Sequence, residues 1–187
     1  MLTYPRAEAR VLILAMAATT TAACGGAGGK SAASTPACMP AGLRATAGFQ
    51  GATGSMLGGL SVTNTSGHTC ALPTTPQVSL IWHGRTLAVQ RVAFPHGWLH
   101  SQYPRGSSRL HLLKPGQTAF VVLQWWNWCG PKLSSRGYFQ GGVALRLGSQ
   151  PGGVVMARLR DVAPPYCNGP PSTMRVSGFL PPLKASS

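Results

Sequence analysis

Acidic side chains are almost absent from this sequence, which holds only Glu8 and Asp161 among its 187 residues. The formal net charge is +14, and +13 remains if a leader carrying Arg6, Glu8 and Arg10 is removed. Glycosidases and aspartic proteases need a pair of carboxylates, so this inventory excludes both classes. A surface of one sign attracts anionic envelope polymers, lipid headgroups or acidic proteins, and this attraction weakens with salt. The alternative is a charge that only keeps the protein soluble.

Motifs of the common enzyme classes are also missing. No Gly-x-Ser-x-Gly elbow, P-loop or dinucleotide fingerprint is present. A Ser-His-Asp triad would have to use Asp161, for which Arg158 and Arg160 are nearer partners. We therefore expect a protein that is not an enzyme and that uses no cofactor.

The first 23 residues have the organisation of a signal peptide, with Arg6 and Arg10 before an apolar run over residues 11–18. This run is too short to span a bilayer comfortably. Residues 21–24, TAAC, resemble a bacterial lipobox with Thr21 in the place of the usual leucine, so we expect Cys24 to carry the lipid, including a palmitate-type acyl chain. Residues 24–37 then form the anchor and a glycine-rich tether. The predicted location is the extracytoplasmic face of the cell membrane, and secretion after cleavage behind Ala17 is the alternative.

Four cysteines remain in the body of the chain, an even number, and an exported chain meets an oxidising compartment. Three pairings are possible, and we favour Cys38–Cys70 with Cys129–Cys167 because each joins a long segment to a strand end. Each bond is expected to contribute about 4 kcal/mol in the chain-entropy model. No Cys-x-x-Cys spacing supports a zinc site.

In the remainder of the chain, short apolar runs alternate with Gly and Pro, which predicts one all-β domain over residues 38–180. Residues 181–187 are expected to be a disordered tail. The organising segment of the domain is residues 115–129. It starts with a predicted type II turn at Pro115-Gly116 and continues as a long apolar strand over residues 118–128. This strand should lie centrally in a sheet, with Trp125 and Trp128 in the core and Trp126 the tryptophan to test for exposure. The other predicted strands cover residues 56–64, 78–82, 87–93, 110–113, 143–147, 154–160 and 174–179.

Glycines in the strand over residues 56–64 indicate a bulge or a close backbone approach. Asn64-Thr65-Ser66 is formally a glycosylation sequon, and we interpret it as a turn only. The strands on either side of residues 148–153 should form a hairpin. Strands at this spacing predict a two-sheet sandwich.

Two predicted loops, residues 94–109 and 130–142, carry basic and aromatic side chains, and long loops of this kind are often functional. His96 and His100 are four residues apart, a spacing that suits copper or zinc on a helix. Pro95 and Gly97 argue against a firm helix and no third ligand is near, so no metal site is predicted. The candidate binding surface consists of His96, Trp98, His100, Tyr103, Arg105, Arg109, Trp126, Lys132 and Arg136.

A series of short motifs resembles domain-of-unknown-function family 4232, found in secreted and lipid-anchored actinobacterial proteins. The motifs, quoted in chain order, are Cys38, NTSG at 64–67, CAL at 70–72, PQVSL at 76–80, LKPG at 113–116, LQWWNWC at 123–129, Cys167 and VSGF at 176–179. The resemblance covers about residues 38–180 and implies an immunoglobulin-like β-sandwich with two disulfides. It implies no activity. The basic segment 94–109 and the near absence of acids depart from the usual pattern.

These observations predict an exported, lipid-anchored protein of the cell envelope that acts as a binding or structural module through its basic loops. Its expected partners are the membrane, through the anchor, and an anionic envelope polymer, lipid headgroups or an acidic protein. The alternative is a copper or zinc chaperone using His96 and His100, with His83 or methionines in support. A nucleic-acid partner does not fit an exported address.

Overall fold

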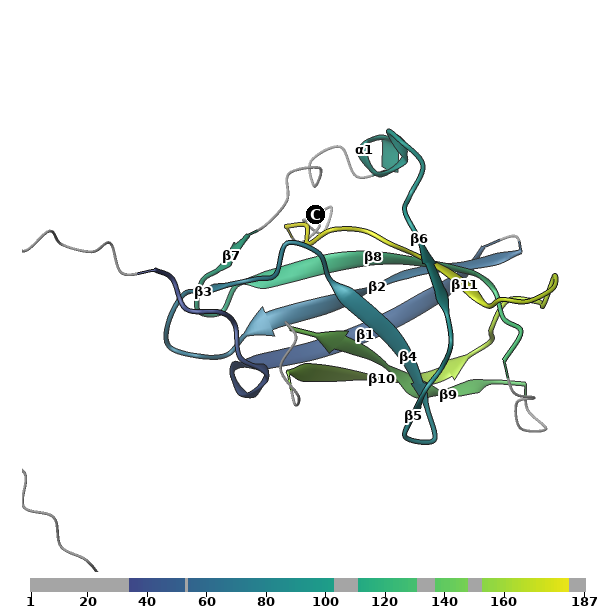
Figure 1. The fold of residues 1–187 in the computed structure, drawn as a ribbon, viewed down its shortest axis with the longest axis horizontal. Coiled ribbons are helices and arrows are strands. Elements are labelled where there is room, and N and C mark those ends of the chain that lie inside the picture. The colour runs from purple at the N-terminus through teal and green to yellow at the C-terminus, as the bar shows by residue number, and fades with distance from the viewer. Residues whose placement is uncertain (1–33, 53, 103–110, 131–136, 148–152, 182–187) are drawn as a thin grey trace, which may run out of the picture. The chain divides into compact units, whose positions relative to one another are not determined.

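The computed structural model describes residues 34–181 except for 53, 103–110, 131–136 and 148–152. The chain divides into two units, Met1–Ala33 and Ser34–Ser187, and the first of them lies outside the described residues. The described part of the second unit is an all-β sandwich of two sheets, as predicted (Figure 1). None of its helices has the length and apolar character needed to cross a membrane.

The larger sheet has five strands in the spatial order β1, β2, β8, β11 and β6. Adjacent strands in this sheet are antiparallel, except that β11 and β6 run parallel to each other. In that spatial order the strands are Leu43–Ala52, Ser55–Asn64, Thr118–Asn127, Thr173–Val176 and Gln90–Val92.

The smaller sheet has four strands in the order β10, β9, β4 and β5, all antiparallel. These strands are Val154–Val162, Phe139–Arg146, Gln77–Trp82 and Arg85–Thr86. A separate ribbon pairs β3 with β7, and one 3-10 turn (η1) and one short helix (α1) complete the described elements. Their bounds are Cys70–Ala71, Leu112–Leu113, Pro40–Gly42 and Trp98–Gln102.

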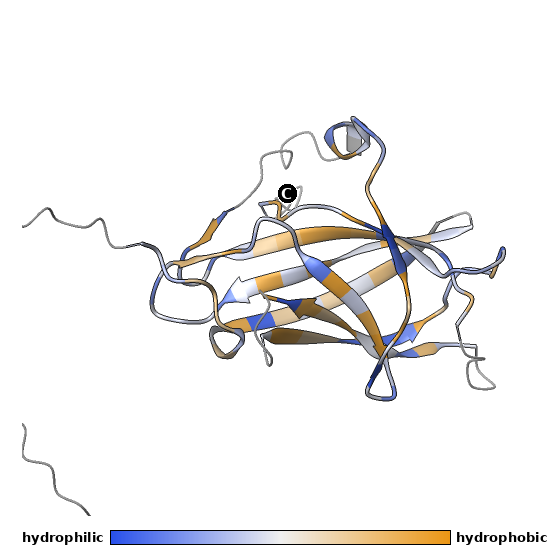
Figure 2. Ribbon diagram, viewed as in Figure 1, coloured by the Kyte–Doolittle hydropathy of each residue, from blue (hydrophilic) through white to orange (hydrophobic). Residues whose placement is uncertain are grey.

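Strand β8 is the central strand of the larger sheet, which confirms the prediction for residues 118–128. Trp125 on its inner face is fully buried. The indole lies edge to face against Phe139 of the smaller sheet, with ring centroids 5.5 Å apart, and against Trp128 at 5.3 Å. Aromatic pairs of this kind contribute about 0.5–1.5 kcal/mol each beyond their burial. The cluster therefore joins the two sheets. Figure 2 shows that hydrophobic residues follow β8, whereas the β4–β5 turn is hydrophilic.

Two predicted turns form as the residue types require. Gly116 has φ of 73°, and the N–H of the next residue donates to the Lys114 carbonyl oxygen at 3.0 Å, which confirms the type II turn. Between β4 and β5, His83 and Gly84 have φ of 47° and 74°. Two successive residues with positive φ give a tight hairpin whose twist matches its strands.

Glycines in this fold lie where strands pack closely, and one glycine-containing strand was predicted as a loop. A Cβ on Gly58 would lie 2.0 Å from the Gly48 carbonyl oxygen, so the predicted close approach is present, while the register of β2 runs without a bulge. The hairpin of β9 and β10 is confirmed. However, the prediction of a loop up to residue 142 was wrong, because β9 begins at Phe139, which is buried. Gly141 is needed there because a Cβ would lie 2.2 Å from the Ile81 carbonyl oxygen.

Three further strand assignments need correction. Strand β1 was not predicted, because its inward residues include the small Ala45 and Ala47 and give a weak alternation. Residues 87–93 are not one strand: β5 ends before them in the smaller sheet and β6 belongs to the larger one. Strand β11 ends at Val176, yet the chain stays beside β8, because Leu180 and Phe120 exchange backbone hydrogen bonds of 2.8 Å.

Both favoured disulfides are present. Cys38 is bonded to Cys70 and Cys129 to Cys167, with Cα atoms 4.8 Å apart in each pair. The first bond ties the segment before β1 to the β3–β7 ribbon. The second ties the end of β8 to the segment that leads into β11.

Asn64, the first residue of the sequon, is completely buried at the end of β2. Its Nδ2 donates to the carbonyl oxygens of His68 and Leu113, both at 2.8 Å. Its Oδ1 accepts from the Ser66 backbone N–H at 2.9 Å and from the Ser66 hydroxyl. The amide is therefore part of the turn and not available for a glycan, in agreement with the prediction.

Replacing Asn64 with Ala should lower the free energy of unfolding by about 3 kcal/mol, because buried backbone groups lose their partners. Chemical denaturation of the domain measures this loss. Thr65→Ala, at the exposed neighbouring position, is the control and should change stability by less than about 0.5 kcal/mol. Equal stability of the Asn64→Ala variant and the parent would contradict the assignment.

Candidate binding surface

Tryptophan 126 lies on the outer face of the larger sheet, where β8 bulges. Thr173 of β11 is opposite Asn127, and Met174 is opposite Trp125, so Trp126 is the extra residue between them. Bulges often turn a side chain toward a site. Trp126 is half-buried here, whereas Trp125 and Trp128 belong to the core, as predicted.

Arg175 of β11 packs on Trp126, with the guanidinium carbon 4.6 Å from the ring centroid. Its Nη1 donates to Gln124 Oε1 at 3.0 Å, which fixes the plane of the group. Its Nε is buried and has no hydrogen-bond partner in the described part of the chain. No carboxylate among the described residues pairs with it, since Asp161 is their only acid and belongs to β10. The arrangement presents an oriented, uncompensated cation, the form in which arginine recognises carboxylates and phosphates.

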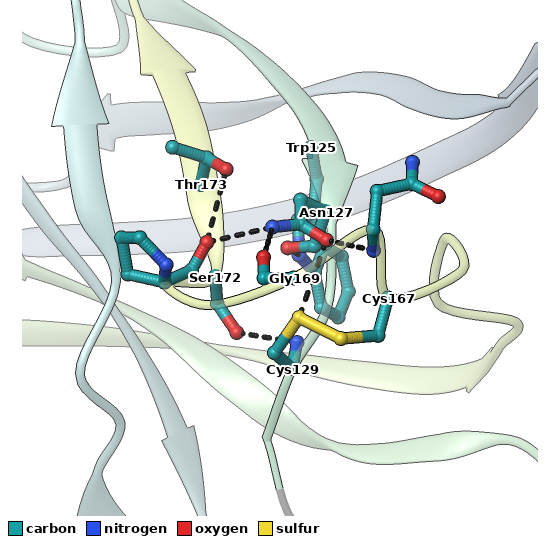
Figure 3. The surroundings of a disulfide bond; sticks show 9 residues. Trp125, Asn127, Cys129, Cys167, Gly169, Ser172 and Thr173 are labelled. Carbon is teal, nitrogen blue, oxygen red and sulfur yellow. Dashed lines mark hydrogen bonds between the residues drawn. A yellow bond between two sulfur atoms is a disulfide. The ribbon is translucent and has the colours of Figure 1, made fainter.

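Hydrogen bonds around the second disulfide fix the end of β8 beside the segment that leads into β11 (Figure 3). Asn127, which is buried, donates through Nδ2 to the carbonyl oxygens of Gly169 and Pro171, both at 2.7 Å. The Cys129 backbone N–H donates to the Ser172 hydroxyl at 2.8 Å. Together with the Cys129–Cys167 bond, these contacts fix residues 167–172 on the end of β8. Strand β11 starts directly after these residues, so its register against β8 is fixed. This register places Arg175 over Trp126.

The two histidines of the predicted loop lie on one cleft. His96 and His100 line a space of about 740 Å³ between residues 93–100 and 176–180. Helix α1 starts only after Gly97, whose φ is 76°, so the two histidines do not share a helix face. Trp98 stacks on Phe94, with centroids 4.7 Å apart and planes at 17°.

The remaining residues of the candidate surface cannot be placed. Tyr103, Arg105, Arg109, Lys132 and Arg136 lie outside the described residues, as does Cys24. Within the described ranges no three His, Cys, Asp or Glu side chains gather in a way that could hold a metal ion.

A basic face that sequence reasoning missed lies on the outside of the smaller sheet. Arg158 of β10 lies between the buried Ala157 and Leu159, so it points away from the core and is exposed. Arg146 of β9 follows the buried Leu145 and is exposed as well. Arg160 is exposed beside them, next to a register shift at which Asp161 has φ of 54°. No ion pair joins Asp161 to either neighbouring arginine in the described structure. Strand alternation could have indicated this face once the β10 register was known.

Arg175 was also missed. The sequence placed it in a strand, but only the pairing of β11 with β8 brings it to Trp126 and Gln124. No local pattern carries that information, because the partners are about fifty residues apart.

Comparison with known proteins finds one family model. It is described as "Domain of unknown function (DUF4232)" and matches residues 38–171, which include all four disulfide cysteines. No curated protein and no solved structure matches the chain.

Proposed function

The chain belongs to the DUF4232 family, and we propose that it is an exported, lipid-anchored module of the cell envelope that binds an anionic partner without catalysing a reaction. The observation that carries the proposal is an exposed basic surface with almost no acids to compensate it. Seven of the described lysines and arginines are exposed, and the only described acid is Asp161. The seven are Arg44, Arg85, Arg91, Lys114, Arg146, Arg158 and Arg160.

Such a surface forms few internal salt bridges, so its charges are left to solvent or to a partner. An anionic polymer or lipid surface close to the anchor would be held at high local concentration by the tether. The proposed location follows from the leader and from Cys24, and the proposed lack of catalysis follows from the inventory of acids.

Replacing Arg146, Arg158 and Arg160 together with Gln should weaken binding to vesicles containing anionic lipid, or to a teichoic-acid-like polymer, by about 100-fold at low salt. The estimate takes about 1 kcal/mol for each basic residue near an anionic surface. Binding of the parent should fall steeply as salt is raised. Sedimentation with the vesicles or polymer measures both effects.

The matched control is Gln77→Ala with Gln140→Ala, which removes exposed polar groups from the smaller sheet without changing charge. It should bind as the parent does. Binding that is indifferent to salt, or absent at low salt, would contradict the proposed function.

The anchor has its own test. Cys24→Ser should release the protein from the membrane fraction into the medium, because the diacyl group supplies the anchoring energy. Mass spectrometry of the parent should find lipid on an amino-terminal cysteine. An unmodified terminus in a secreted parent would favour cleavage without lipid.

A second candidate function rests on the shared cleft of His96 and His100. Imidazole is a preferred ligand of copper and zinc, and a metal chaperone needs an exposed, exchangeable site. Calorimetry with copper or zinc should then give heat at micromolar protein, and His96→Ala with His100→Ala should remove it. His111→Ala, at an exposed histidine outside the cleft, is the control. Absence of heat from the parent would end this alternative.

A further inference from the structure

A hollow of about 570 Å³ lies in β1 and β2 on the outer face of the larger sheet. In its middle, Gly48 of β1 is opposite Gly59 of β2, which in turn is opposite Val122 of β8. The sheet therefore has no side chains on two adjacent strands at this level. Ala47 and Phe49 also line it, although they pack against the core. The other side chains around the hollow are those of Thr46, Gln50, Leu57, Ser61 and Phe120.

One wall of the hollow is aromatic. A Cβ on Gly59 would lie 2.1 Å from Cζ of Phe120, so the phenyl ring occupies the place that a side chain at residue 59 would take. A Cβ on Gly48 would meet no atom within 4 Å. The ring is only half-buried.

The hollow and the Arg175–Trp126 pair lie on the same outer face of the larger sheet, with Gln124 of β8 between them. Leu57, at its border, is directly opposite Gln124, and Gln124 accepts the hydrogen bond that orients Arg175. Side chains in direct opposition have Cβ atoms about 4.5–5.5 Å apart. An aromatic wall, three polar side chains and an uncompensated guanidinium thus follow one another across the same face of the sheet.

We propose that the hollow and Arg175 form one binding site for an acidic oligosaccharide, a chain of sugar rings that carries carboxylate or phosphate groups. The C–H face of one ring would pack on Phe120, as aromatic side chains commonly allow. Its hydroxyls would hydrogen-bond with Thr46, Gln50 and Ser61, polar groups that fix orientation in a mainly apolar concave site. An anionic group on a neighbouring ring would meet the guanidinium of Arg175, which can donate to either anion.

This inference rests on the proposed function and names the site and the ligand class within it. The polar side chains of Thr46, Gln50 and Ser61 argue against an acyl chain, because it would cover them without offering hydrogen-bond partners. An extended acidic peptide would use charge but would gain nothing from a ring-sized hollow beside Phe120.

The test compares Gly48→Thr and Arg175→Gln with the parent, using oligogalacturonate, a phosphorylated hexose oligomer, a neutral galactose oligomer and polyglutamate as probes at physiological salt. Gly48→Thr fills the hollow without changing charge, and threonine is favoured in strands. Gly67→Thr is its matched control, because a Cβ there also meets nothing within 4 Å, in the turn after β2. Calorimetry gives the affinities, and Trp126 fluorescence reports on Arg175.

The parent should bind at least one acidic saccharide about tenfold or more tightly than the neutral oligomer and polyglutamate, and the galacturonate and phosphate arms identify which anion is preferred. Gly48→Thr should lower the affinity for that saccharide about tenfold or more, and Gly67→Thr should bind it as tightly as the parent does. Arg175→Gln should bring the acidic saccharide down to the affinity of the neutral one.

Parent-like affinity of Gly48→Thr, or equal affinity of the parent for polyglutamate, would overturn this site. If anionic polymers still bind with steep salt dependence and only the Arg146, Arg158 and Arg160 substitutions weaken them, the site fails and the proposed function stands. If no anionic polymer binds at low salt, both fail.

Discussion

The edge-to-face packing of Trp125 against Phe139 and Trp128 is the contact on which the rest of the structure depends. It joins the central strand of one sheet to a strand of the other at the end of β8 where the second disulfide is attached. The indole is fully buried, and its Nε1–H donates to the Asn127 carbonyl oxygen at 3.2 Å. Because this large side chain is fixed against both sheets, the end of β8 can pair with its neighbouring strands in one register only. The bulge at Trp126 and the Asn127 hydrogen bonds then follow from that register.

The Arg175–Trp126 pair shows how this rigid frame supports an unfavourable arrangement. A buried donor without a partner, here Arg175 Nε, costs about 1–3 kcal/mol. The cation–π contact at 4.6 Å returns about 0.5–2 kcal/mol, and the bond to Gln124 adds to it. The balance is close to neutral, so stability alone does not explain an arginine at this position. A half-buried cation that the fold neither needs nor neutralises is consistent with the binding role proposed for it.

Sequence reasoning succeeded where the information is local. Residues 118–128, the turn at Pro115-Gly116 and the hairpin after Phe139 are specified by neighbouring residue types, and the cysteine parity constrained the disulfides. It failed where pairing with distant strands decides the outcome. β1 is a strand because β2 pairs along its whole length, although alanine and glycine are poor strand formers. Gly141 looked like a loop residue because the sequence does not show the Ile81 backbone against it. For the same reason Arg175 could not be placed on Trp126.

The scarcity of acids has opposite consequences for folding and for binding. The described fold is held by its apolar core and two disulfides, and salt has no ion pair to screen among the described residues. What salt does screen is repulsion between like charges, which relieves the folded state. The same screening weakens attraction to an anionic partner. Loss of binding in salt would therefore coincide with equal or greater stability of the domain, and it could not be attributed to unfolding.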